Sequence, residues 1–408
     1  MLVSGNLTSN FNTPRLDWGC RRNHRKHKYY EVTAANQFCL QKLADVRNLN
    51  SAYRILEQDG GHGAGIDHLT FEDFSPGEVF EALRQVSEAI QNQTYQPYET
   101  LSVLAPKGDG RFRELSLQRI TDRTVAKSLQ LALNTFWRRR LPGIGRDVYR
   151  IYAKMQRVMR ERNHYVLAID DIENCFPSAR IEDVFNSHRR FIGQPELLWL
   201  IDRILRGHDG PQRTIGLDQG SPYSPVGMEL LLHTRFDEVI NTPRRGYPLL
   251  LRYVDNLTFV CNNEREGHEI LYRAKAILSE LEMNLKGTDG DPQDIRDPKF
   301  NTSVLGLIPR WQDGQLKFTI PEASFKNLEQ GLIKSMEYPN PTLISRSVVT
   351  GWMEAIGPAF TNTTSREIMD QALNITRRCG FREFSLAEIR EAASCGRTRW
   401  MKLSRSVG

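Results

Sequence analysis

The chain has 408 residues, with 55 lysines and arginines against 49 aspartates and glutamates, which gives a formal charge of +6 at pH 7. Hydrophobic residues make up 39 % of it and charged residues 25 %, a composition that excludes a disordered or fibrous protein. No apolar run reaches the roughly 20 residues that a bilayer span needs, and the first residues lack the pattern of a signal peptide. We therefore expect a cytoplasmic protein with no membrane contact.

Basic residues gather beside aromatic residues at both ends of the chain. Residues 1–48 are polar and basic, with five lysines and arginines just before Tyr29 and Tyr30. A second group surrounds Trp400 and consists of Arg397, Arg399, Lys402 and Arg405. Charge that meets phosphates and flat rings that meet bases suit a nucleic-acid surface, although solvated helix ends have the same composition. We expect residues 1–48 to form an arm or a helical extension.

Two helices are predicted in the first part of the chain. Ser75, followed by proline and by Glu78, forms a capping box and predicts a helix through about Gln91. A second helix is expected to begin at a cap, Thr121 or Asp122, and its apolar side includes Val125, Leu129, Leu131 and Leu133.

The middle of the chain reads as strands. Residues 165–172 form a short apolar run that ends in carboxylates, which predicts a buried strand. Residues 248–254 and 257–261 predict a hairpin with Asp255-Asn256 as its tight turn, because both residue types tolerate left-handed backbone. After about residue 320 the pattern is mostly helical. Strands tipped with aspartate between helical layers predict an α+β domain with an active site at the sheet edge.

Two of these aspartates, Asp171 and Asp255, are candidates for metal binding. Carboxylates on adjacent strand tips can share Mg²⁺ ions, hard cations that prefer oxygen ligands. Such ions can activate an attacking hydroxyl and stabilise the departing pyrophosphate in nucleotidyl transfer. Taken alone, each aspartate is more often a turn or cap residue.

Five segments in a consistent order give these aspartates a context. Pro106–Arg113 with Asp122-Arg123 comes first, and Asp171-Ile-Glu-Asn-Cys-Phe176 follows, an aspartate with an aromatic residue five positions later. The others are Gln219-Gly-Ser-Pro-Tyr-Ser-Pro225, Tyr253-Val-Asp-Asn256 and Val304–Leu307.

With these segments the chain resembles a reverse transcriptase from about residue 50 to 310. The segment at Asp171 is similar to the first catalytic motif of that family, the segment at Gln219 to the QGSPLSP motif, and the segment at Tyr253 to the YxDD hairpin except in its last residue. The first segment resembles fingers motifs of prokaryotic, group II intron-like enzymes, and the last resembles the primer-grip FLG element.

The resemblance implies a right-hand polymerase, with fingers and palm over residues 49–310 and a helical thumb over 311–408. It implies that Asp171 and Asp255 are catalytic and hold Mg²⁺, together with the backbone carbonyl of Ile172 and, less strongly, the Asn256 amide. It also implies contacts to the incoming dNTP from Lys107, Arg113, Phe176, Gln219 and Gly220. Contacts to primer and template are implied for Tyr253, Leu305 and Gly306.

Several of these roles have a physical basis and a plain alternative. Lys107 and Arg113 supply positive donors for a triphosphate, and separately they would suit a charged β-turn. Gly220 allows close approach of the backbone to a base, while the segment could also be a proline-rich helix start. Phe176 corresponds to the family's steric gate against a ribose 2′-hydroxyl; otherwise it would be a core residue.

The chain departs from the family at two places. Asn256 replaces the second aspartate of the hairpin motif, which removes one negative charge. Asp170 is a poor substitute for that aspartate, because neighbours on a strand face opposite sides. In the segment that resembles LGLxLNxxKT, the usual lysine position holds Asp289, and Lys286 lies three residues earlier. A general-acid role for Lys286 is therefore a hypothesis only.

The type of reverse transcriptase is inferred by elimination. The tail lacks the Cys/His-rich endonuclease of mobile group II introns, Ser224-Pro225 differs from the SQ of diversity-generating enzymes, and Val349-Thr-Gly351 lies too late to be the retron VTG motif. What remains resembles stand-alone, defence-associated bacterial enzymes, with a non-coding RNA template, a DNA product and dNTPs as partners. The sequence also leaves open whether the chain has a protein partner or forms a homo-oligomer. The alternatives are a catalytically silent nucleic-acid-binding scaffold and an RNA-dependent RNA polymerase, which Phe176 disfavours.

Overall fold

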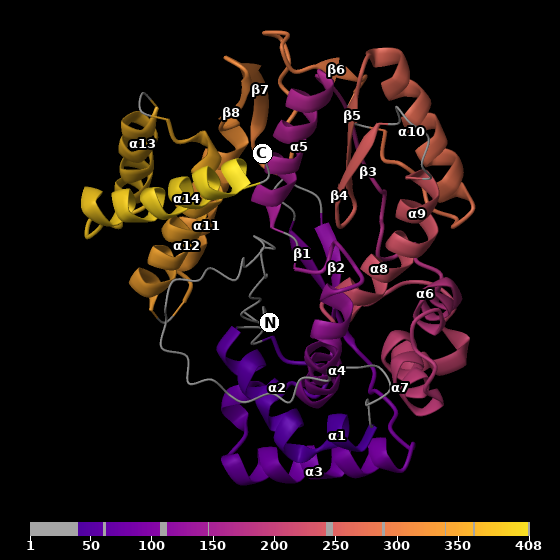
Figure 1. The fold of residues 1–408 in the computed structure, drawn as a ribbon. Helices are drawn as coiled ribbons and strands as arrows, with labels where there is room; N and C mark the ends of the chain where they lie inside the picture. Colours follow the sequence, from indigo (N-terminus) through magenta and orange to yellow (C-terminus); the bar gives the residue numbers. More distant parts are fainter. Residues whose placement is uncertain are drawn as a thin grey trace. The chain divides into compact units, whose positions relative to one another are not determined.

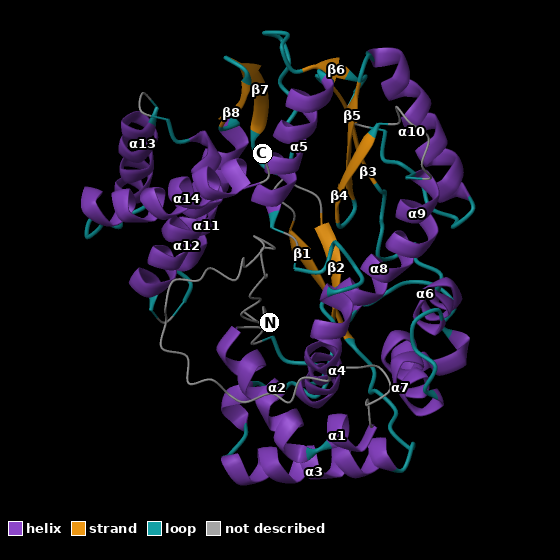
Figure 2. Cartoon of the chain, viewed as in Figure 1, coloured by secondary structure: helices purple, strands orange, loops and turns teal. Residues whose placement is uncertain are grey.

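A computed structural model describes residues 40–59, 63–106, 112–145, 147–241, 248–287, 290–338, 340–361 and 364–406. Helices and antiparallel sheets alternate along the chain, which confirms the predicted α+β class (Figures 1 and 2). The chain divides into two compact units. Unit 1 comprises Met1–Gly145, Ile172–Thr242 and Ala274–Leu285, and unit 2 comprises Arg146–Asp171, Pro243–Arg273 and Lys286–Gly408.

Unit 1 is mainly helical and contains one two-stranded sheet, β1–β2. Its elements are α1 (Leu40–Ala44), α2 (Val46–Asp59), η2 (Phe71–Asp73), α3 (Pro76–Gln91), β1 (Leu101–Pro106), β2 (Phe112–Leu117), α4 (Ile120–Arg138), α6 (Ile181–Arg189), α7 (Pro195–Arg206), η3 (Gly207–Gln212), α8 (Ser224–Leu232), η4 (His233–Asp237) and α9 (Glu238–Ile240). The boundary that we place after residue 48 falls within α2.

The capping box predicted for α3 is confirmed. The Ser75 hydroxyl accepts from the backbone N–H of Glu78, and the Glu78 carboxylate accepts from the backbone N–H of Ser75. The helix ends at Gln91, as the sequence pattern predicts.

The predicted start of α4 is wrong. The helix begins at Ile120, and neither Thr121 nor Asp122 caps it. The Asp122 side chain is 3 % exposed, and its carboxylate accepts from the Tyr95 hydroxyl (2.7 Å) and the Tyr98 backbone N–H (3.0 Å). Both carboxylate oxygens of Asp122 therefore accept hydrogen bonds from the segment that contains Tyr95 and Tyr98. Of the four apolar positions predicted for this helix, three are buried and one is half-buried.

Unit 2 contains a four-stranded sheet of order β4-β5-β3-β6, a hairpin β7–β8 and a group of C-terminal helices. Its elements are α5 (Val148–Arg162), β3 (Val166–Asp171), β4 (Leu249–Tyr253), β5 (Asn256–Cys261), the first part of α10 (Glu264–Ser279), β6 (Gln293–Asp294), β7 (Ile308–Gln312), β8 (Gln315–Thr319), α11 (Glu322–Ser335), α12 (Pro341–Ala355), η5 (Gly357–Ala359), α13 (Ser365–Arg378) and α14 (Leu386–Ser406).

The sheet confirms the predicted strands but corrects their turn. Tyr253 pairs with Asn256, so the two central residues of the turn are Val254 and Asp255, one position earlier than expected. Val254 has a φ of 55°, and Asn256 is the first residue of β5. The register is set by the apolar residues of β4 and β5, which are buried along both strands and override the turn preference of Asp-Asn.

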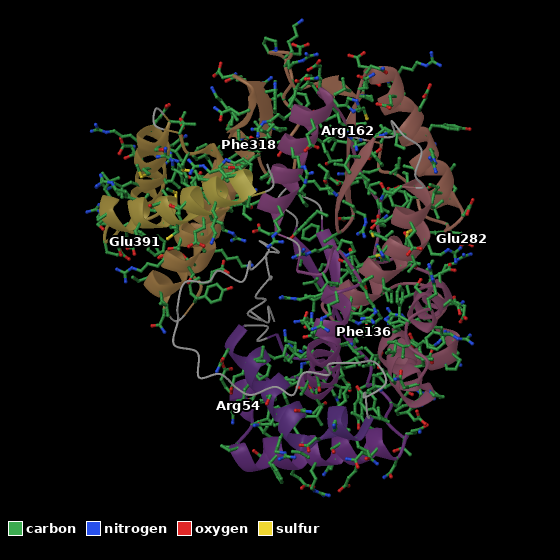
Figure 3. All side chains as sticks on the ribbon, in the orientation of Figure 1. Arg54, Phe136, Arg162, Glu282, Phe318 and Glu391 are labelled. Atoms are coloured by element: carbon green, nitrogen blue, oxygen red, sulfur yellow. The ribbon has the colours of Figure 1, made fainter. Side chains whose placement is uncertain are left out.

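The C-terminal helices confirm the helical pattern after residue 320. The helical segment expected from residue 311 begins only at Glu322, because residues 308–319 form the hairpin β7–β8. Trp400 of α14 anchors this region, since its ring lies edge-on to those of Tyr149, Tyr152 and Phe318. Phe318 is marked on β8 in Figure 3. No helix in the described ranges is long and apolar enough to cross a membrane.

Candidate active site

The centre of the site is the pair formed by the ends of β3 and β5. Asp171 is the last residue of β3 and lies opposite Asn256, the first residue of β5. The Nδ2 of Asn256 donates to the Oδ1 of Asp171 at 2.9 Å. The Thr258 hydroxyl donates to the Oδ1 of Asn256 at 3.3 Å. The amide therefore directs its nitrogen, and not its oxygen, toward the carboxylate.

Asp255 lies immediately before this pair, in the turn that joins β4 to β5, and its side chain is half-buried. The turn places Val254 in the left-handed region, with a φ of 55°. A β-branched residue rarely adopts this conformation, and a residue held there costs on the order of 1–3 kcal/mol. The packed strands on both sides of the turn hold this strained backbone, and with it the position of Asp255.

Lys286 brings a positive charge to Asp171. Its Nζ lies 3.5 Å from the Oδ2 of Asp171, and its backbone N–H donates to the Asp171 carbonyl at 2.8 Å. Both side chains remain about 30 % exposed, with 29 % for the lysine and 31 % for the aspartate. The general-acid role for Lys286, a hypothesis from the sequence, stays a prediction. Asp289, the other residue of that comparison, lies outside the described residues.

Asp170 holds this lysine segment from the opposite face of β3. Its side chain is 6 % exposed, and its Oδ1 accepts from the backbone N–H groups of Asp171 (2.8 Å) and Gly287 (3.0 Å). Strand alternation makes Asp170 a poor metal ligand, but the sequence analysis missed its role as an anchor. A carboxylate directly before the catalytic candidate, in a strand predicted to be buried, is the signal that could have revealed this role.

The donor chemistry fits a divalent cation. Asp171 ends β3, Asp255 lies in the turn before β5, and both carry carboxylates, the ligands that hard cations such as Mg²⁺ prefer. Ile172 and Leu285 form an antiparallel bridge through backbone hydrogen bonds of their neighbours. The Glu173 N–H donates to the Asn284 carbonyl and the Lys286 N–H to the Asp171 carbonyl, so the Ile172 carbonyl takes no part in these two bonds. The described residues contain no cluster of three or more His, Cys, Asp or Glu side chains that could hold a metal. The assignment of Asp171 and Asp255 as metal ligands stays a prediction.

Unit 1 brings together the segments expected to contact the nucleotide. The Gln219 carbonyl accepts from the backbone N–H of Ser116 on β2, the strand that also carries Arg113. Gly220 has a φ of 128°, and a Cβ there would lie 3.0 Å from the Ser116 carbonyl oxygen, so the close approach requires glycine. Phe176 is half-buried, and its carbonyl accepts from the Leu217 N–H at 2.9 Å. Lys107 lies outside the described residues.

The segment compared with the primer grip is a tight turn in unit 2. Val304 and Leu307 exchange two backbone hydrogen bonds, and the residues between them, Leu305 and Gly306, have φ values of 49° and 97°. The buried Tyr152 hydroxyl donates to the carbonyls of Val304 (2.9 Å) and Leu305 (3.1 Å). Tyr152 was missed, because nothing in the sequence of α5 points to a turn 152 residues away.

Tyr253 ends β4 at the other side of the catalytic turn and is half-buried. Burial raises the pKa of its hydroxyl above the ordinary value, and the negative charge of Asp147 adds to this effect. The hydroxyl is therefore neutral at physiological pH and can act as a hydrogen-bond donor.

Comparison with solved structures gives distant likenesses. One is the sicinivirus 3Dpol RNA-dependent RNA polymerase, with 11 % identity and a TM-score of 0.49 over 84 % of this chain and 73 % of that one. Another is apo telomerase from Candida tropicalis, with 12 % identity and a TM-score of 0.44 over 76 % and 67 %. Similarities of this size do not bear on substrate or partner. No curated protein gave a significant match.

A family model matches the middle of the chain. Residues 105–288 match the model described as reverse transcriptase (RNA-dependent DNA polymerase). The matched segment contains Asp171, Asp255, Lys286 and the Gln219–Gly220 loop, the residues whose geometry is given above. The chain therefore contains, over residues 105–288, a reverse transcriptase domain.

Proposed function

We propose that this chain synthesises DNA on an RNA template, with Asp171 and Asp255 as its catalytic residues. The observation that carries the proposal is the position of Asp171 at the end of β3, opposite Asn256, the residue that follows Asp255, within the reverse transcriptase segment. A bound Mg²⁺ would supply Lewis-acid activation of the primer hydroxyl and of the leaving pyrophosphate. Lys286 would hold the Asp171 carboxylate in place from the side opposite to the Asn256 amide.

The residues of unit 1 have proposed roles toward the nucleotide. Arg113, with its planar fork of donors, suits the triphosphate of a dNTP, and Lys107 would add a second positive charge. Phe176 would exclude a ribose 2′-hydroxyl. The Gln219–Gly220 loop would approach the template base, and the absence of a Cβ at Gly220 lets this loop pack closely against Ser116 of β2.

The wider role rests on the family resemblance. We propose fingers and palm over residues 49–310 and a thumb over 311–408, with Tyr253 and the Leu305–Gly306 turn at the primer and template. A non-coding RNA would be the template, in antiviral defence in the bacterial cytoplasm. A protein partner or a second copy of the chain would fit the same role.

The second candidate is a catalytically silent scaffold, and the Asn256 amide is the observation that favours it. This amide donates to Asp171 in the place where the family carries a third carboxylate. A site with one negative charge fewer binds a divalent cation more weakly. In that case the chain would bind nucleic acid next to an active enzyme without synthesising DNA itself.

Incorporation of labelled dNTPs by the purified protein with its bound RNA separates these candidates. We expect Mg²⁺-dependent polymer from the wild type and none from Asp255→Asn, which keeps the shape of the turn. The matched control is Asp313→Asn, in the tight turn between β7 and β8 of the same unit, and should retain activity. Activity that survives Asp255→Asn would reject the site, and a wild type inactive at every metal concentration would favour the scaffold.

A further inference from the structure

A cavity in unit 2, outside the candidate active site, is lined by residues of α5, β8 and the end of α14. Its volume is about 460 Å³, within the range of small-molecule sites. The described residues that line it are Gln156, Arg160, Gln315, Leu316, Trp400, Met401, Ser404 and Arg405. None of these lining residues is acidic.

Gln156 is the buried polar group of this cavity. It is 6 % exposed, and its Oε1 accepts from the backbone N–H of Leu316 at 3.0 Å. This bond fixes the orientation of the amide, because only an oxygen can accept there. Within the described part of the chain, the Nε2 of Gln156 has no hydrogen-bond partner. Two N–H donors of a nearly buried amide are therefore available at the cavity wall.

Two arginines add positive charge at the same place. Arg160 and Arg405 are exposed and, among the described residues, neither guanidinium has an ion-pair or hydrogen-bond partner. Neighbouring arginines differ in this respect. Arg157 forms an ion pair with Glu161 at 2.8 Å, and Arg399 forms one with Asp147.

The surrounding helices are also rich in positive charge. Helix α5 carries five basic residues and a single acidic one, Glu161, which already pairs with an arginine. Helix α14 has no acidic residue after Glu391, and its last turns carry four basic residues. These four are the basic group that the sequence places around Trp400. The field around the cavity thus attracts anions.

We propose that this cavity binds a phosphodiester of single-stranded nucleic acid, with Arg160 and Arg405 on the phosphate and the Gln156 amide as a further donor. The arginine fork suits phosphate oxygens, and the hydroxyl of Ser404 lies in the same wall. Met401 provides an exposed apolar side on which an unstacked base can lie, next to the buried Leu316 and Trp400 of the same lining. A duplex, whose bases are stacked inside, could use only the charges. RNA and DNA strands share this chemistry.

The variant Gln156→Glu tests the proposal most sharply. A carboxylate retains an acceptor for the Leu316 N–H but replaces the donor with a negative charge that faces the phosphate. We expect its affinity for a labelled single-stranded oligoribonucleotide to fall at least tenfold at unchanged melting temperature. Arg160→Ala and Arg405→Ala should each lower the affinity about tenfold. Each should also reduce the magnitude of the slope of log K against log salt concentration by about 0.7. Binding is measured without dNTPs or metal, so the result does not depend on polymerase activity.

The matched control is Arg157→Ala, which removes the same charge from the same helix outside the cavity and should change affinity less than twofold. A 4-thiouridine oligoribonucleotide should cross-link to residues 400–405 in the wild type and not in Gln156→Glu. The same oligonucleotide sequence as DNA compares binding of a DNA strand with that of an RNA strand. A duplex should bind without cross-linking to residues 400–405. Equal losses for Arg157→Ala and Arg160→Ala, or cross-links only elsewhere, would overturn the proposal. Tighter binding of a phosphoserine peptide than of either strand would also overturn it.

Discussion

The Nδ2 of Asn256 donates to the Oδ1 of Asp171 across the first residue pair of β3 and β5, at 2.9 Å. Lys286 lies on the other oxygen of the same carboxylate, with its Nζ 3.5 Å from Oδ2. Asp171 is therefore held by a neutral donor and a cation from its own chain. A related site with a third carboxylate would instead carry like charges on directly opposed strand residues, which destabilise a sheet until a cation binds.

The variant Asn256→Asp tests this balance. Without metal, we expect the free energy of unfolding to fall by about 1 kcal/mol, because a hydrogen bond to Asp171 is replaced by repulsion. Added Mg²⁺ should restore it, and half-maximal synthesis should need less Mg²⁺ than in the wild type. Thermal unfolding with and without Mg²⁺, together with a metal titration of synthesis, gives both values. A loss of stability that Mg²⁺ does not reverse, with synthesis abolished, would mean that the amide has another role.

The variant Lys286→Met removes the cation and keeps most of the side-chain volume. We expect the affinity of the protein for Mn²⁺ to rise about tenfold, because an ammonium group close to the carboxylate opposes a divalent cation. The rate of synthesis should nevertheless fall, since Asp171 loses one of its two side-chain partners. Equilibrium binding followed by electron paramagnetic resonance gives the affinity. Lys317→Met, which removes the lysine paired with Asp313 on β8, is the control, and equal affinities for both variants would contradict the prediction.

Phe176→Ala tests the proposed gate. Removal of the ring should increase the incorporation of ribonucleotides relative to deoxyribonucleotides, because space opens where a 2′-hydroxyl would lie. Competition between labelled dNTP and rNTP on one primer and template measures the ratio. If the wild type already uses both equally, Phe176 is a packing residue and its removal changes only stability.

The pH dependence of stability should reveal Asp122. Burial raises the pKa of this carboxyl from 3.8 to about 6, so the native state binds its proton more tightly than the unfolded chain does. The free energy of unfolding should therefore fall as the pH rises from about 4 through 6, by about 3 kcal/mol for a shift of this size. Asp122→Asn removes this loss, because an amide can accept from the Tyr98 N–H and donate to the Tyr95 oxygen.

Urea unfolding of both proteins at about pH 4 and pH 8 tests this, because the other titrating groups cancel in the difference. The variant should gain stability relative to the wild type at the higher pH. A difference between the two proteins that does not change with pH would show that Asp122 is ionised throughout.

The sequence predicts the parts of this fold that depend on local pattern. The box at Ser75 and Glu78 defines the start of α3, and the apolar run before Asp171 defines β3, because capping and burial act over a few residues. The hairpin turn was placed one residue too late, because the buried register of β4 and β5 decides it, and not the preference of Asp-Asn. The sequence pattern suggests that Asp122 is a helix cap, because the contacts of its carboxylate with Tyr95 and Tyr98 cannot be seen in the sequence.

The residues of the candidate site also fall into those that the sequence predicts and those that it does not. Asp171 and Asp255 follow from motifs, whereas the anchor role of Asp170 and the hydroxyl of Tyr152 on the Val304–Leu307 turn depend on contacts between distant segments. Periodicity carries no information about such contacts. The cavity at Gln156 is a further example, since it needs α5, β8 and α14 together.

Sequencing of the DNA made by the purified protein with its bound RNA tests the central claim most directly. We expect DNA complementary to that RNA from the wild type in the presence of Mg²⁺ and dNTPs, and none from Asp171→Asn, which keeps an acceptor for the Asn256 amide. DNA of the same sequence from Asp171→Asn, or wild-type DNA unrelated to the bound RNA, would contradict an RNA-templated polymerase centred on Asp171 and Asp255.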